Sequence, residues 1–244
     1  MRSYICPNLP LEQYVYRTEL HAHTRPASHC SDIVPERLVE AYAALGYDTV
    51  VLTNHIRPNY TLDDCLQHIR DYREAAAAAL DYGMTILFGV ELTFSDLWGD
   101  YLVYGVEPSD MTALHRYCQS GYQSFAESPE RKKSIVFTAH PYRNDRIGEE
   151  LHIPYLADGV ESINLHPRVN SDNGYMTRTA WNQDLLTICG TDYHHEGHEG
   201  MTAILTTEKP KTEIHLRDIL RSGDYLMEVN GNIILPSHRM QKKQ

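Results

Sequence analysis

The sequence predicts a single α/β domain folded as a (β/α) barrel, and three observations support this fold class. Short β-rich segments alternate with segments of helical period along the 244 residues, which favours a mostly parallel sheet. Polar residues gather where the expected strands end, and this face carries the active site in (β/α) barrels. The length also suits one barrel of this class. An open, doubly wound sheet is the less favoured alternative.

The N-terminal part of the chain alternates strands and helices. Apolar, β-rich residues predict strands over residues 14–23, 49–53 and 84–90. A helix begins at Pro35, because proline suits the first helical turn, and ends at Gly46. Thr61 caps a second helix, which has apolar residues at helical spacing and ends at Gly83.

The C-terminal part continues the alternation. We expect strands over residues 101–104, 134–139, 159–164, 185–190 and 203–205. Helical segments are expected over roughly residues 109–125 and 212–222. The polar tail from Met240 is expected to fray. Because the chain has no long linker and no repeat of fixed period, we expect residues 1–244 to form one domain.

Composition narrows the class of protein. The formal net charge of −11 disfavours a general nucleic-acid surface, since such binding depends on Lys and Arg. The five cysteines are scattered and include no Cys-x-x-Cys pair, which indicates reduced thiols. No apolar run approaches the ~18 residues of a membrane span, and the N-terminus lacks an apolar signal segment. We therefore expect a cytoplasmic protein without a membrane partner.

Seven potential metal ligands fall at or just beyond the ends of expected strands: His21, His23, His55, Glu91, His140, Asp192 and His194. Side chains alternate faces along a strand, so pairs spaced by two residues point the same way. Imidazoles and carboxylates without thiolates suit Zn²⁺, Mn²⁺ or Fe²⁺. Seven ligands exceed the needs of one tetrahedral ion, so we expect two or more ions bridged by a carboxylate such as Glu91. Clustered ions of this kind promote phosphoryl hydrolysis.

The same residues resemble those of the PHP (polymerase and histidinol phosphatase) domain phosphoesterases. The matching motifs, in the order of the family, are Glu-Leu-His21-Ala-His23, Leu-Thr-Asn-His55, Gly-Val-Glu91, Ala-His140-Pro141 and Gly-Thr-Asp192-Tyr-His194. The resemblance runs from about Arg17 to Tyr225. It implies a distorted (β/α)7 TIM-like barrel of PHP type with a trinuclear metal centre.

The resemblance also implies two further ligands and a division of the ligands among the ions. His29 matches a loop ligand of the family, and Asp100 stands where the family commonly has a histidine. Cys30, beside His29, is not favoured as a thiolate ligand. By analogy, the ligand sets are His21, His23, Glu91 and Asp192 for one ion, Glu91, Asp100 and His140 for a second, and His29, His55 and His194 for a third.

The expected reaction is hydrolysis by a metal-bound hydroxide, because metal-bound water ionises near neutral pH. An arginine near the ions would spread the negative charge that develops on the phosphate oxygens. Arg143 is the favoured phosphate ligand, followed by Arg168 and Arg57, since all three lie just beyond strands at the same face. No side chain is assigned as the general acid.

The leading function is therefore a phosphoesterase with two to three Zn, Mn or Fe ions, acting on a small phosphomonoester or nucleotide. The alternatives are a phosphotyrosine-protein phosphatase of the same fold, an amidohydrolase-like metal hydrolase and a non-catalytic metal-binding regulatory barrel. The amidohydrolase is disfavoured, because that family commonly has a bridging lysine at a strand end and the lysines here miss such positions. The sequence does not determine the natural substrate, the choice between monoester and diester, the metal or the oligomeric state.

Overall fold

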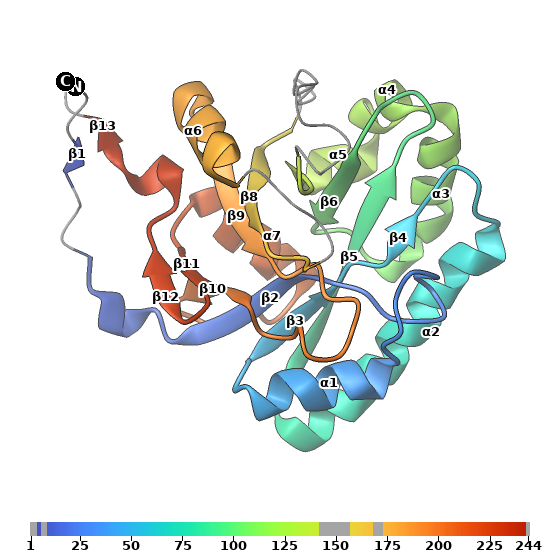
Figure 1. Ribbon diagram of the computed structural model, residues 1–244. Coiled ribbons are helices and arrows are strands. Elements are labelled where there is room, and N and C mark those ends of the chain that lie inside the picture. The colour runs from blue at the N-terminus through green and yellow to red at the C-terminus, as the bar shows by residue number, and fades with distance from the viewer. Residues whose placement is uncertain (1–3, 6–8, 142–156, 168–172, 243–244) are drawn as a thin grey trace.

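The computed structural model describes residues 4–5, 9–141, 157–167 and 173–242. The chain has a mixed α/β architecture in which helices lie around a curled sheet (Figure 1). None of the described helices combines the length and apolar character needed to cross a lipid bilayer.

The described elements follow one another along the whole chain. The helices are α1 (Pro35–Ala44), α2 (Leu62–Ala79), α3 (Met111–Ser120), α4 (Tyr122–Ala126), α5 (Pro129–Lys133), α6 (Asn173–Gln183) and α7 (Glu213–Ser222). The strands are β1 (Tyr4–Ile5), β2 (Tyr16–Ala22), β3 (Thr49–Leu52), β4 (His55–Ile56), β5 (Thr85–Thr93), β6 (Asp100–Tyr104), β7 (Ile135–Thr138), β8 (Gly159–Asn164), β9 (Leu186–Gly190), β10 (Thr202–Thr206), β11 (Leu226–Val229), β12 (Asn232–Ile234) and β13 (Gln241–Lys242).

The main sheet is mixed rather than wholly parallel. Its strand order is β12-β11-β10-β2-β3-β5-β6-β7-β8-β9, and β4 pairs with β5 beside this path. Strands β2, β3 and β5 are parallel, as are β7, β8 and β9. Strand β6 runs antiparallel between β5 and β7, and β10 to β12 extend the sheet in antiparallel fashion from β2. Strands β1 and β13 pair separately near the termini (Figure 1).

The curled sheet brings its β9 end back to β2. Tyr193 N, beyond β9, donates to His21 O at 3.1 Å, and His23 N donates to Tyr193 O at 3.0 Å. Strand β9 also lies against β10 and β11. This curvature is consistent with the expected PHP-type barrel. The seven-fold alternation of strand and helix is not confirmed, because β6 follows β5 as an antiparallel neighbour without a helix between them.

Local signals set most helix boundaries where the sequence placed them. Pro35 occupies the first turn of α1, and Thr61 forms a capping box with Asp64 at the start of α2. The helical region expected over 109–125 divides at Gly121 into α3 and α4. Elements not expected from the sequence are β1, β4, α5, α6 and the β11–β12 hairpin, and part of the tail expected to fray forms β13.

A bulge in β2 links the core to the polar site. One buried apolar cluster draws residues from β2, β3, β5, β6, β7, β9, β10 and β11, so it fills the inside of the curl. Leu20 and His21 of β2 together stand opposite the single residue Val51 of β3. Because a bulge re-aims successive side chains, Leu20 joins Val51 in this cluster while the His21 ring reaches the polar residues of the site.

Candidate metal centre

Seven of the nine expected ligands come together where strands end. His21 lies in β2, His55 begins β4 and Glu91 lies in β5. His23 follows β2, His140 follows β7, and Asp192 and His194 follow β9. All seven side chains are buried. The parallel strands of the sheet therefore deliver residues far apart in sequence to one buried polar site.

Four of these side chains have the spacing of ligands to one ion. His21 Nε2 lies 3.5 Å from Glu91 Oε2 and 3.4 Å from Asp192 Oδ1. His23 Nε2 lies 3.3 Å from each of the same two oxygens. A tetrahedral ion with ligands at about 2.0–2.1 Å holds neighbouring ligand atoms about 3.3–3.4 Å apart. These four imidazole–carboxylate distances match that spacing, and His21, His23 and Asp192 form one of the groups of converging ligand atoms.

Neighbouring groups orient both imidazoles for this role. His21 Nδ1 lies 2.8 Å from Glu161 Oε1, and His23 Nδ1 lies 3.1 Å from Ser28 Oγ. An ionised carboxylate only accepts hydrogen bonds, so His21 carries a proton on Nδ1 and can present the lone pair of Nε2. Within the described part of the chain, the buried Nε2 atoms of His21 and His23 have no hydrogen-bond partner. Such atoms are costly to bury without a partner, and a metal ion would supply one.

The charges of the site favour a bound cation. Burial raises the pKa of Glu91, but His55 and His21 hold that pKa well below its usual value. Burial also raises the pKa of Asp192, and His21 again reverses the effect. Burial lowers the pKa of His21, whereas Asp192 and Glu161 raise it well above 6.5. Both carboxylates are therefore ionised at neutral pH, and a metal ion that binds here displaces the imidazole protons that offset them.

Glu91 contacts imidazoles through both of its oxygens. Glu91 Oε1 lies 2.9 Å from His140 Nε2. Glu91 Oε2 lies 2.7 Å from His55 Nδ1 and also faces His21 and His23. A carboxylate in this position can bridge two ions, which is the role expected from the sequence.

A group of imidazoles adjoins the four central ligands. Ring nitrogens of His23, His55 and His194 lie within 4.8 Å of one another. His194 Nε2 lies 3.2 Å from the Sγ atom of Cys30. Burial raises the pKa of the Cys30 thiol, but hydrogen bonds with His194 and His55 outweigh burial and lower the pKa to about 6. A thiol with a lowered pKa therefore borders this side of the site.

The remaining two expected ligands lie outside these groups. His29 is exposed, and its ring stacks on Tyr60 with 5.3 Å between the centroids. Asp100 begins β6, where Thr93 Oγ1 donates to its carboxylate at 2.6 Å. Among the described residues, the groups of three or more converging ligand atoms include neither side chain. Their assignment as ligands stays a prediction.

Of the three arginines expected to bind phosphate, Arg57 is described. It is half-buried, and its charge interacts with His55 and Tyr60, so it lies at the edge of the site. Arg143 and Arg168 lie outside the described residues, and their role also stays a prediction.

Two of the expected ligands have backbone in the left-handed region. The φ angle is 23° at His140 and 55° at Asp192. Side chains at such positions carry strain of roughly 1–3 kcal/mol, and such strain concentrates at functional sites. Here His140 N donates to Glu161 Oε2 at 2.8 Å, and Asn164 Nδ2 lies 3.4 Å from Asp192 Oδ2. These contacts help to hold both strained residues with their side chains in the site.

Comparison with known families decides the wider classification. A family model described as the PHP domain matches residues 19–232, a range that includes every expected metal ligand. The chain belongs to the PHP domain family. This confirms the resemblance carried by the sequence motifs. No curated protein sequence matches the chain.

Two of the solved structures that resemble this PHP domain show how the fold recurs. One is a two-domain protein from Bacteroides vulgatus that contains a predicted PHP-like metal-dependent phosphoesterase. This match has 17% sequence identity and a TM-score of 0.63, and it covers 95% of this chain and 69% of that chain. The other is PsfC from Pseudomonas syringae, with 14% identity, a TM-score of 0.56, and coverage of 78% of this chain and 80% of that chain. At these identities the likeness concerns the fold alone.

Sequence reasoning missed several residues that shape the site of this PHP domain. Glu161 was expected only as part of a strand, yet its oxygens contact His21 Nδ1, His140 N and Asn164 Nδ2. A carboxylate inside an otherwise β-rich segment was the available signal. Cys30 was not favoured as a ligand, although its thiol faces His194. No pattern in the sequence shows which of the two adjacent loop side chains, His29 or Cys30, faces His194.

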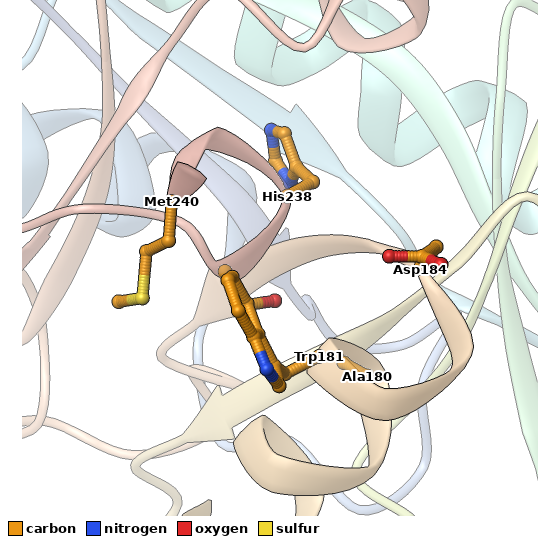
Figure 2. A pocket seen from close by; sticks show the side chains of 6 residues that line it. Ala180, Trp181, Asp184, His238 and Met240 are labelled. Atoms are coloured by element: carbon orange, nitrogen blue, oxygen red, sulfur yellow. The ribbon is translucent and has the colours of Figure 1, made fainter. Parts of the chain in front are cut away.

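A separate cavity lies beside α6 and the C-terminal segment of the PHP domain (Figure 2). Its volume is about 250 Å³, and its lining consists of Ala180, Trp181, Asp184, Ser237, His238 and Met240. None of the expected metal ligands lines it, so the metal centre and this cavity are distinct places in the molecule.

Proposed function

We propose that this PHP domain is a metal-dependent phosphoesterase that hydrolyses a small phosphomonoester or nucleotide. The observation that carries the proposal is the spacing of 3.3–3.5 Å between buried ligand atoms of His21, His23, Glu91 and Asp192. The match to the PHP family supports the same assignment. We take residues 1–244 as one distorted (β/α)7 barrel of PHP type that acts in the cytoplasm.

The proposed centre holds two to three divalent ions, each Zn²⁺, Mn²⁺ or Fe²⁺. The ligand sets are His21, His23, Glu91 and Asp192 for the first ion, Glu91, His140 and Asp100 for the second, and His55, His194 and His29 for the third. Asp100 accepts from Thr93 through Oδ1 and His29 stacks on Tyr60, and neither belongs to a group of converging ligand atoms among the described residues. In the first set the imidazole–carboxylate distances are already 3.3–3.5 Å, so we expect this set to bind most tightly.

The residues of the chain have definite tasks in this proposal. Bound ions of this kind supply Lewis acidity and lower the pKa of a coordinated water toward neutrality. Glu161 and Ser28 hold His21 and His23 in the tautomers that face the ions. Arg57, with Arg143 and Arg168, would bind phosphate oxygens, since guanidinium groups match phosphate geometry.

The test combines metal analysis with a panel of phosphate esters. Protein purified without chelator should contain two to three equivalents of Zn, Mn or Fe, and should hydrolyse at least one phosphomonoester or nucleotide with added Mn²⁺ or Zn²⁺. Asp192→Asn should lower that rate by more than about 100-fold, because loss of a direct ligand should exceed the 10–100-fold effect of an outer contact. The matched control Asp224→Asn changes a carboxylate outside the site and should retain the wild-type rate. Fully metal-loaded protein with no turnover across the panel would contradict the proposal.

A further inference from the structure

The loop after β2 turns a thiol, and not the expected imidazole, toward His194. Both residues are exposed, but Cys30 Sγ lies 3.2 Å from His194 Nε2, whereas the ring of the adjacent His29 stacks on Tyr60. We propose that the Cys30 thiolate is a metal ligand and replaces His29 in the third ligand set, at the position that the family resemblance assigns to His29. This inference rests on the proposed metal centre. It means that a residue of this loop determines which metal one position of the centre prefers.

The imidazole opposite Cys30 has one ring nitrogen available for a metal ion. His194 Nδ1 lies 2.8 Å from the backbone oxygen of Asp192. A carbonyl oxygen only accepts, so Nδ1 carries a proton, and Nε2 is the nitrogen that a metal ion can take by displacing the proton shared with the Cys30 sulfur. That Nε2 atom faces Cys30 Sγ. The pair therefore offers one nitrogen and one sulfur to the same ion.

Three buried imidazoles converge beside Cys30. His23, His55 and His194 are all buried, and one ring nitrogen of each lies within 4.8 Å of those of the other two. Cys30 thus borders a group that already has the composition of a metal site, and it is not an isolated surface cysteine.

The observed distance suits an ion between sulfur and nitrogen. Zn²⁺ binds sulfur at about 2.3 Å and imidazole nitrogen at about 2.0–2.1 Å, so a tetrahedral angle separates the two ligand atoms by about 3.5 Å. The separation of 3.2 Å between Cys30 Sγ and His194 Nε2 needs an opening of only a few tenths of an ångström. His29 would have to abandon its stacking on Tyr60 to take the same place.

A thiolate ligand changes which metal the position prefers. Thiolate is a soft ligand that favours Zn²⁺, whereas Mn²⁺ prefers carboxylate and water oxygens. When the ion binds, the sulfur–metal bond forms as the thiol proton passes to solvent. The position next to His55 and His194 should therefore select Zn²⁺ over Mn²⁺.

The test uses cobalt as a spectroscopic replacement for zinc in the full chain. Metal-stripped protein titrated with Co²⁺ should develop an intense sulfur-to-cobalt charge-transfer band in the near ultraviolet. Cys30→Ser should lose this band and bind Zn²⁺ at one position more than about tenfold more weakly. His29→Ala should keep the band. The matched control Cys65→Ser removes a buried thiol of α2 and should also keep it.

X-ray absorption at the zinc edge of the wild-type protein provides a check that needs no variant, with a sulfur neighbour expected at about 2.3 Å. Cobalt binding without a charge-transfer band would overturn the assignment of Cys30 and leave the metal centre intact. The assignment of Cys30 also fails if His29→Ala loses the band and Cys30→Ser keeps it. Failure to bind any cobalt would instead overturn the proposed metal centre, and with it the role of Cys30.

Discussion

Glu161 shows how one side chain outside the proposed ligand set can organise the site. Its Oε1 atom lies 2.8 Å from His21 Nδ1, while Oε2 accepts from His140 N at 2.8 Å and from Asn164 Nδ2 at 3.0 Å. The carboxylate is almost fully buried. Because a carboxylate partner fixes the tautomer and raises the basicity of a ligating histidine, Glu161 acts as a positioning residue for His21.

We predict that Glu161→Gln weakens binding of the first metal ion by about 10–100-fold, because the neutral amide no longer enforces the His21 tautomer. Competitive titration of metal-stripped protein with a zinc-sensitive dye measures the change. Glu228→Gln, in a carboxylate that pairs with Arg17 away from the site, is the matched control and should leave zinc affinity unchanged. Equal zinc affinity in Glu161→Gln and wild type would show that Glu161 does not act through His21.

The buried residue His68 supports the site through Asn54 and Ser28, without contacting the proposed metal ions. His68 Nδ1 accepts from Asn54 Nδ2 at 3.1 Å, and His68 Nε2 donates to Gly89 O at 2.7 Å. Asn54 Oδ1 in turn accepts from Ser28 Oγ at 2.8 Å, and Ser28 contacts His23. If His68 were protonated, its Nδ1–H group would face the Nδ2–H group of Asn54, and two donors cannot form a hydrogen bond. Burial lowers the pKa of His68 from 6.5 to about 4.

This lowered pKa predicts a pH-dependent contribution to stability. Below its unfolded pKa of 6.5 the unfolded chain binds the His68 proton more readily than the folded chain does. The contribution is therefore complete above pH 6.5 and is lost as pH falls toward 4, with a total of about 3 kcal/mol. Denaturant unfolding of the wild type and His68→Gln, both with chelator, measures this contribution. The difference between their free energies of unfolding should shrink by about 3 kcal/mol between pH 7 and pH 4. A difference that stays constant with pH would contradict the prediction.

At the scale of elements, the site depends on the close approach of β9 to β2 and β8. A Cβ atom added at Gly190, the last residue of β9, would lie 2.0 Å from Glu161 Oε1 and 2.7 Å from His21 Cβ. Neither group can move without disturbing the hydrogen bond between Glu161 and His21. Only glycine allows the strand end to pass this close to the proposed ligands.

We predict that Gly190→Ala displaces Glu161 and His21 and lowers the affinity for the first ion at least about tenfold, in addition to destabilising the fold by about 1–3 kcal/mol through overpacking. Calorimetric metal titration and thermal unfolding measure the two effects. Gly231→Ala is the control: its added Cβ meets nothing within 4 Å, and its positive φ of 74° should cost about 1–2 kcal/mol without any change in metal affinity. Normal metal binding by Gly190→Ala would show that the strand end tolerates a side chain.

At the scale of the whole molecule, metal binding and folding should be coupled. The curl of the sheet collects ligands from β2, β4 and β5 and from the segments after β7 and β9, so the unfolded chain has no preformed site. The chain also carries a formal net charge of −11. Divalent cations bound among the buried carboxylates and imidazoles would therefore stabilise the folded state and reduce this negative charge.

We predict that chelation lowers the melting temperature of the metal-loaded protein. For each ion present at about 100 times its Kd, the stabilisation is about 2.7 kcal/mol, or roughly 5–10 °C for a chain of this size. Scanning fluorimetry with and without EDTA measures the shift. Asp192→Asn should respond less to EDTA because it lacks one central ligand. Identical melting of chelated and metal-loaded wild type would argue against a metal centre built into the fold.

The amino-acid sequence by itself determined the family, the position of most strands and helices, and the residues that gather at the site. Helix starts at Pro35 and Thr61 depend on local chemistry, and the polar residues that end the strands follow a pattern that needs no coordinates. The motifs around His21, His55, Glu91, His140 and Asp192 were enough to predict the PHP family, which the family match confirms.

The tertiary structure decided how those residues are aimed and which others support them. The β2 bulge opposite Val51, the return of the β9 end to β2 and the antiparallel placement of β6 arise from pairing between distant strands. No local pattern encodes such pairing, because it depends on long-range packing. The same reason explains why only the folded loop shows Cys30 facing His194 while its neighbour His29 lies against Tyr60.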